Sequence, residues 1–213
     1  MKFIKKTSEQ KHAEQRKRFH AWVEGLPEFK VAPLTLSFWR DSFLFFVMFG
    51  MVGHVVDILW RIMMDIPVET WIWQLTPIIA EPYGFGALAL LWFVYPLVRT
   101  RKIGPFATYV LGAILTTAVE FLCGAVMMLT HGGVNPYWTY SHLPFNLFGI
   151  VCLYNAIFFG LVSVVFAYFI FPSIDKQMKR IGGRAISVLA IALAVCYGIS
   201  LISQLLTGTR LFF

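Results

Sequence analysis

Four residues that can carry charge interrupt long apolar stretches of this sequence: His54, Asp57, Arg61 and Glu120. A charged side chain at the centre of a membrane helix costs about 2.5–3.5 kcal/mol on insertion scales, so such residues are candidates for function. His54, Asp57 and Glu120 are the candidate catalytic groups, because imidazole and carboxyl side chains exchange protons. With Arg61, the two carboxylates can instead bind a polar solute or relay protons.

Three of these residues share one helical face. His54, Asp57 and Arg61 have the spacing i, i+3 and i+7, which predicts that one helix points all three toward its neighbours. Asp57 and Arg61 are four residues apart, so they can form an ion pair, or Asp57 can leave Arg61 to bind an anion. The alternative is that the pair and His54 only fix this helix in the bundle.

Glu120 lies in a second such pattern. Small or polar residues recur every four positions around it: Gly112, Thr116, Glu120 and Gly124. This seam suits close helix approach. No cation lies three or four residues from Glu120, so we expect a partner from another helix, Arg61 or His54, or a protonated carboxyl. The alternative is a neutral, hydrogen-bonded Glu120 that serves packing only.

The composition indicates how these residues are held. The 213 residues are 58% hydrophobic and 14% charged, against about 45–50% and 25% in soluble domains. This predicts a polytopic membrane protein and excludes a disordered chain, a disulfide scaffold and an ordinary cytosolic enzyme. The net charge of +7 does not indicate nucleic acid, because the Lys and Arg residues gather in the N-terminal segment and in short loops between apolar spans.

The predicted fold class is all-α, a polytopic bundle of about five transmembrane helices. Five segments are long enough to cross a bilayer: 43–64, 78–98, 105–129, 145–171 and 185–206. All Lys and Arg except Arg61 and Arg210 fall on one side of these spans, so the positive-inside rule places the N-terminus in the cytoplasm and the C-terminus outside. We expect a basic segment, 1–40, and a transmembrane bundle, 41–213, in a cell membrane.

The basic N-terminal segment carries start and stop signals for one helix, from Thr7 or Ser8 to Gly25. Phe19, Trp22 and Val23 could enter the membrane interface while the neighbouring cations meet anionic headgroups. A solvated basic tail is the alternative.

The predicted heights of the polar residues coincide. Asp57 and Glu120 both fall in the outer half of their spans, and the second and fourth spans enter from outside at 81–84 and 144–146. We therefore expect a shared polar cavity near the outer leaflet, with the aromatic loop 131–146 as a lid or as an interfacial anchor. The candidate substrate-binding residues are Asp57, Arg61, Glu81, Tyr83, Glu120, Trp138, Tyr140 and Asn146.

Several of these segments carry a family resemblance. They are Gly-His-Val-Val-Asp at 53–57, Glu-Pro-Tyr-Gly-Phe-Gly-Ala at 81–87, Tyr-Trp-Thr-Tyr-Ser at 137–141 and Pro-Phe-Asn-Leu-Phe-Gly-Ile-Val-Cys-Leu at 144–153. Over residues 43–172 the sequence resembles the type IV ABC-transporter permease (CmpB-like) family of small membrane proteins. The resemblance implies a multi-pass helical fold and a transport component.

Two positions depart from the family pattern. The family usually has Trp-Asp-Tyr-Ser and Asn-Leu-x-Gly-Arg-Ile, whereas this chain has Thr139 in place of the acid and Ile150 in place of the arginine. The departures indicate an Asp–Arg pair lost together, with His54, Asp57 and Arg61 supplying polar groups instead.

The sequence favours a permease or carrier component. It contains no Gly-x-x-x-x-Gly-Lys-Ser/Thr loop, so the expected partners are a separate ATPase or second permease chain, a second copy of this chain and membrane lipids, without nucleic acid. Neither a cofactor nor a bound metal is expected.

Two alternatives stay open. One is an intramembrane enzyme acting on a lipid-like substrate, with His54 as base, Asp57 orienting it and Glu120 as acid; a metal-assisted version adds His131 or His142. The other is an accessory subunit of a larger membrane complex.

Overall fold

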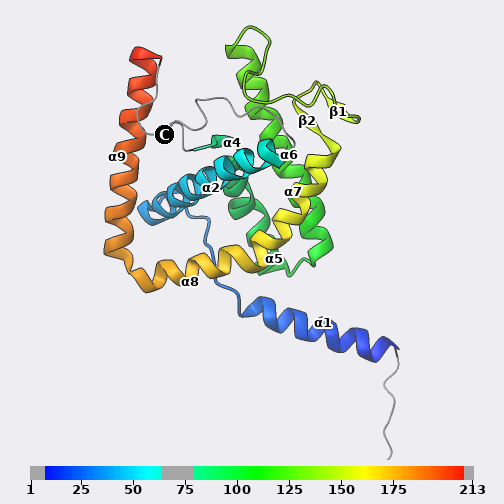
Figure 1. The fold of residues 1–213 in the computed structure, drawn as a ribbon. Coiled ribbons are helices and arrows are strands. Elements are labelled where there is room, and N and C mark those ends of the chain that lie inside the picture. Colours follow the sequence, from blue (N-terminus) through cyan, green and yellow to red (C-terminus); the bar gives the residue numbers. More distant parts are fainter. Residues whose placement is uncertain (1–7, 64–78, 209–213) are drawn as a thin grey trace, which may run out of the picture.

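The computed structural model describes residues 8–63 and 79–208, without the side chains of Trp60 and Arg61. Its elements follow in chain order: α1 (Ser8–Glu24), α2 (Leu36–Met63), α4 (Glu81–Ala89), η1 (Leu90–Val94), α5 (Tyr95–Arg101), α6 (Pro105–Thr130), β1 (Asn146–Leu147), β2 (Val151–Cys152), α7 (Leu153–Val165), η2 (Phe166–Ile170), α8 (Phe171–Ile181) and α9 (Gly183–Thr207). Figure 1 shows the helices as one bundle, with α1 at one end and the β1–β2 hairpin at the other. The side chain of Arg61, and Arg210 altogether, lie outside the described residues.

The described residues contain five helical segments long and apolar enough to cross a membrane, which confirms the predicted helical bundle. These segments are Leu36–Leu59, Glu81–Arg101, Pro105–Thr130, Leu153–Ile181 and Gly183–Thr207. The predicted fourth span was wrong at its start, because residues 145–152 form a hairpin instead of helix. Phe145 and Phe148 have φ of 55° and 56°, and Gly149 has φ of 69°, a left-handed backbone that ends helical geometry.

Two π-helical turns, η1 and η2, interrupt the second and fourth spans. Each is followed by a proline near the start of the next helix, Pro96 in α5 and Pro172 in α8. Because proline has no N–H to donate, the helical ladder must rearrange there, and π turns and kinks are the usual result. Tyr95, Phe166 and Phe171 pack around these turns and are among the largest fully buried side chains of the core.

The predicted seam of α6 is confirmed as a contact surface. Gly112, Thr116, Glu120 and Gly124 are all buried. A Cβ at Gly112 would collide with Ser163 of α7, and one at Gly160 of α7 would lie 2.6 Å from the ring of Tyr109. The two helices therefore approach closely through small residues, as membrane helices do where no hydrophobic effect drives them together.

The predicted N-terminal helix is present as α1, and its C-terminal end docks on the bundle. Val23 is fully buried in the protein core, so the prediction that it enters the lipid interface was wrong. Glu24 pairs with Lys102 at the α5–α6 turn, and this ammonium group lowers the pKa of Glu24. Arg99 Nε also donates to the carbonyl oxygen of Leu26, 3.0 Å away. The basic segments α1, the α5–α6 turn and α8 thus gather at one end of the bundle (Figure 1).

Candidate functional site

Glu120 is the buried centre of a polar cluster at the hairpin end of the bundle. Its side chain projects from the α6 seam, and the residue is 8% exposed. Oε1 accepts hydrogen bonds from Tyr140 Oη at 2.9 Å and from Asn155 Nδ2 at 3.2 Å. Asn155 Nδ2 also donates to Tyr140 Oη. The carboxyl group is therefore held by neutral donors, one from the 131–152 loop and one from α7.

The second carboxyl oxygen of Glu120 is different. Oε2 is buried and has no hydrogen-bond partner among the described residues. A buried polar atom without a partner is costly and therefore calls for an explanation. A carboxyl oxygen in this state can take up a proton or accept a hydrogen bond from a bound solute.

A hydrogen-bonded pair, Tyr83 and Asp57, lies near this cluster. Tyr83 Oη of α4 donates to Asp57 Oδ1 of α2 over 2.6 Å. The tyrosine approaches closely because Gly53, one turn before Asp57, leaves room for its ring: a Cβ there would collide with it. Asp57 lies within electrostatic reach of Glu120, and Glu81 and Glu120 both lie within reach of Cys123. The structure thus brings three predicted acids to one end of the bundle.

The 131–152 loop is folded over Glu120. Tyr140 N donates to Gly149 O over 2.8 Å, which fixes Tyr140 to the turn of the β1–β2 hairpin. Trp138 Nε1 donates to the carbonyl oxygen of Ile150 at 3.0 Å. Burial and the neighbouring Glu120 carboxylate raise the pKa of Tyr140 well above its ordinary value, so its hydroxyl stays a hydrogen-bond donor at neutral pH.

Asn146, another predicted binding residue, organises this loop. Its Nδ2 donates to Leu143 O at 2.6 Å, and its Oδ1 accepts from Gly149 N at 3.0 Å. Both bonds are local, and they hold the turn whose carbonyl group positions Tyr140. Asn146 therefore stabilises the loop that contacts Glu120, through hydrogen bonds within the loop itself.

The remaining candidates show no described hydrogen bond to Glu120. His54 is half-buried on α2, and the described residues show no hydrogen bond to its ring. The side chain of Arg61 lies outside the described residues, so its pairing with Asp57 stays a prediction. His131 and His142 are exposed, and no three His, Cys, Asp or Glu side chains of the described ranges come together as a metal site. Two hollows are described, and both lie at the α1 end of the bundle. One is lined by residues of α1, and the other by residues that include Phe29, Arg40 and Ile186. A cavity at Glu120 therefore also stays a prediction.

The two departures from the family pattern are neighbours in space. Thr139 and Ile150 flank the backbone hydrogen bond from Tyr140 to Gly149. Thr139 Oγ1 lies 3.0 Å from Ser141 Oγ, and Ile150 packs against Gly124 of the α6 seam. In this chain a local hydroxyl pair and an apolar contact occupy the two positions.

Sequence reasoning missed Asn155. This residue was treated as part of the apolar fourth span, although it donates to both Glu120 and Tyr140. The available signal was an amide side chain inside an apolar stretch, because such groups form hydrogen bonds between helices.

A family model described as "Putative ABC-transporter type IV" matches residues 44–205. No curated protein and no solved structure matches the chain.

Proposed function

The chain belongs to the type IV ABC-transporter family, and we propose that it is the permease or carrier component of a transport complex. Its five apolar helical segments and its family both support a multi-pass membrane protein with a transport role. The solute is polar, and it is recognised at the hairpin end of the bundle by Glu120 and Asp57.

The observation that carries this proposal is the buried Oε2 of Glu120 under the folded loop, which has no hydrogen-bond partner among the described residues. Oε1 is held by Tyr140 and Asn155, which come from two elements connected through β2. A movement of the loop would therefore uncover a carboxyl group whose Oε2 accepts no hydrogen bond from the described residues. Binding and release of a solute or proton at this atom is the chemistry that a carrier needs.

The positive-inside rule supports an orientation. The basic α1, the α5–α6 turn and α8 lie at one end of the bundle (Figure 1), and clusters of Lys and Arg mark the cytoplasmic face. We propose that this end is cytoplasmic and that Glu120 lies in the outer half of the membrane. ATP hydrolysis then belongs to a separate chain that binds the cytoplasmic end.

The enzyme alternative receives less support. It needs His54 as a base oriented by Asp57, whereas the described residues show no hydrogen bond to the His54 ring, and Tyr83 donates to Asp57 Oδ1. A phenol donor stabilises a carboxylate without creating a base next to it.

Affinity purification from native membranes in mild detergent tests the transport assignment. We expect a nucleotide-hydrolysing chain in stoichiometric amount, and ATPase activity in the purified complex that vanadate inhibits. The control is an unrelated five-helix membrane protein carrying the same tag. Purification of a stable oligomer of this chain alone, with no ATPase after crosslinking in intact cells, would contradict the proposal.

A further inference from the structure

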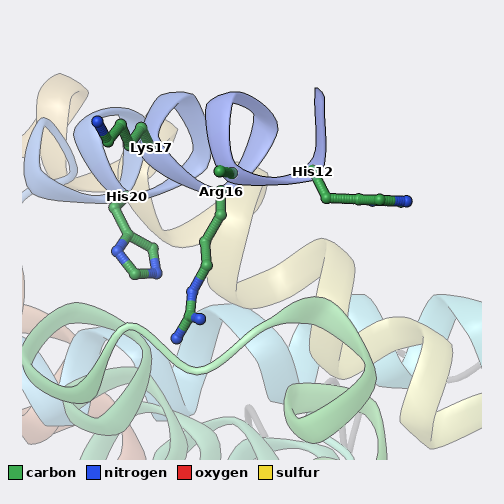
Figure 2. A pocket seen from close by; sticks show the side chains of 5 residues that line it. His12, Arg16, Lys17 and His20 are labelled. Atoms are coloured by element: carbon green, nitrogen blue, oxygen red, sulfur yellow. The ribbon is translucent and has the colours of Figure 1, made fainter. Parts of the chain in front are cut away.

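A cationic hollow lies on the inner side of α1, at the end of the molecule opposite Glu120. It has a volume of about 400 Å³, and its lining residues all belong to α1: His12, Ala13, Arg16, Lys17 and His20. This lining contains no carboxylate. Figure 2 shows Arg16 and His20 pointing from the helix toward the bundle, whereas Lys17 projects away.

The direction of this face is fixed by the docked end of the helix. Val23 follows Arg16 by seven residues and His20 by three, so the three share one face of α1. Since Val23 is fully buried in the bundle core, Arg16 and His20 must face the same side. Arg16 and His20 therefore lie on the bundle side of α1, and the Arg16 side chain stays exposed.

The surroundings of α1 place the hollow at the membrane boundary. Trp22 stacks on Tyr168, with ring centroids 5.6 Å apart, and contacts Phe169 at 6.2 Å. Phe169 belongs to the fourth span and is 60% exposed, as expected of a side chain that faces lipid. Tryptophan at the end of a span is typical of the headgroup level. Because Arg16 is exposed, a lipid headgroup at this level can reach its guanidinium group.

We propose that this hollow binds the phosphate-bearing headgroup of an anionic membrane lipid, with Arg16 as the principal ligand and His12, Lys17 and His20 around it. Guanidinium groups pair well with phosphate oxygens. The headgroup comes from the membrane, because the aromatic contacts hold α1 at its surface. The proposal is independent of what Glu120 binds.

The opposite face of α1 offers a matched control. Arg18 lies two residues from Arg16 and is exposed, and it is paired with Glu14 at 2.8 Å. It does not line the hollow. Replacing Arg16 or Arg18 with alanine removes one positive charge from the same helix, inside the hollow in the first variant and outside it in the second.

Native mass spectrometry of the full chain in a neutral detergent, titrated with phosphatidylglycerol or phosphatidylcholine, tests the proposal. We expect Arg16→Ala to weaken phosphatidylglycerol binding about fivefold, the loss that corresponds to one cation at an anionic surface, and to leave phosphatidylcholine binding unchanged. Arg18→Ala should bind both lipids like the wild type. Lys17→Ala is the second variant, with a smaller loss in the same direction.

Three results would overturn the proposal. Equal losses in Arg16→Ala and Arg18→Ala would mean that α1 is a diffuse basic tail. Unchanged phosphatidylglycerol binding in both Arg16→Ala and Lys17→Ala would mean that the hollow is not the lipid site. Displacement of phosphatidylglycerol by millimolar inorganic phosphate would identify a soluble anion as the ligand.

Discussion

Replacement of Glu120 with glutamine is expected to abolish solute transport while the protein stays folded. Glutamine has nearly the same shape as glutamate, and its carbonyl oxygen can still accept from Tyr140 and Asn155, which now bind Oε1. What is lost is the acidic group whose Oε2 has no partner among the described residues. Transport that depends on this carboxyl should fall to background, a loss of at least about 100-fold if the group binds or releases a charged species at each cycle.

The measurement is ATP-driven accumulation of polar solutes by inverted vesicles from native membranes, with untargeted mass spectrometry of their contents. Glu28→Gln is the matched control, because Glu28 is exposed in the segment between α1 and α2. A solute that accumulates with wild type and Glu28→Gln, but not with Glu120→Gln, is the expected result. Full accumulation with a stably inserted Glu120→Gln would show that Glu120 serves packing only.

Replacement of Tyr140 with phenylalanine is expected to loosen the 131–152 loop. The phenol donates to Glu120 Oε1 at 2.9 Å and accepts from Asn155 Nδ2, so its removal leaves Asn155 with one partner fewer and Glu120 without its loop contact. Deleting one partner of a buried hydrogen bond costs about 1–3 kcal/mol. A change of this size in the opening equilibrium of the loop predicts at least several-fold faster amide exchange in residues 131–152.

Hydrogen–deuterium exchange in detergent or nanodiscs measures this change. Tyr154→Phe is the control, because Tyr154 is 53% exposed at the start of α7 and the described residues show no hydrogen bond from its hydroxyl. Exchange in α9, which does not carry the cluster, should remain as in the wild type. Equal exchange of the loop in wild type and Tyr140→Phe would mean that the backbone bonds of the hairpin alone hold it closed.

Much of the fold was predictable because membrane helices are defined by local composition. Long apolar runs and the distribution of Lys and Arg along the chain predicted five spans, and five are found among the described residues. The four-residue period through Gly112 and Glu120 predicted a buried seam, which α6 has. These signals are local, because in lipid each helix must satisfy its own backbone hydrogen bonds.

The contacts of the site were less predictable, because they join residues distant in the chain. The sequence predicted a partner for Glu120 on another helix, with Arg61 and His54 as candidates, but the described partners are Tyr140 and Asn155. Tyr140 reaches Glu120 only because the loop turns back through left-handed residues such as Phe148. No periodic pattern in the sequence predicts that turn.

The contacts of α1 with the bundle were also hard to predict from the sequence. Phe19, Trp22 and Val23 were predicted to enter the interface as a group, since an apolar side chain on a basic helix fits either lipid or protein. Val23 instead packs into the core, while Trp22 remains partly exposed beside Tyr168. Whether an apolar side chain of α1 contacts lipid or protein depends on the surface that the bundle presents to it. The residue pattern of a single helix does not contain this information.

In the proposed transport cycle, the Tyr140 loop covers Glu120 at rest and uncovers it during transport. The most direct measurement is the rate at which dicyclohexylcarbodiimide, which reacts with carboxyl groups in apolar surroundings, modifies Glu120 in native membrane vesicles with and without ATP. Peptide mass spectrometry reports the modified fraction. We predict slow labelling without ATP, several-fold faster labelling with ATP, and fast labelling under both conditions in Tyr140→Phe. Identical labelling rates in the wild type with and without ATP would show that the loop does not uncover Glu120 during transport.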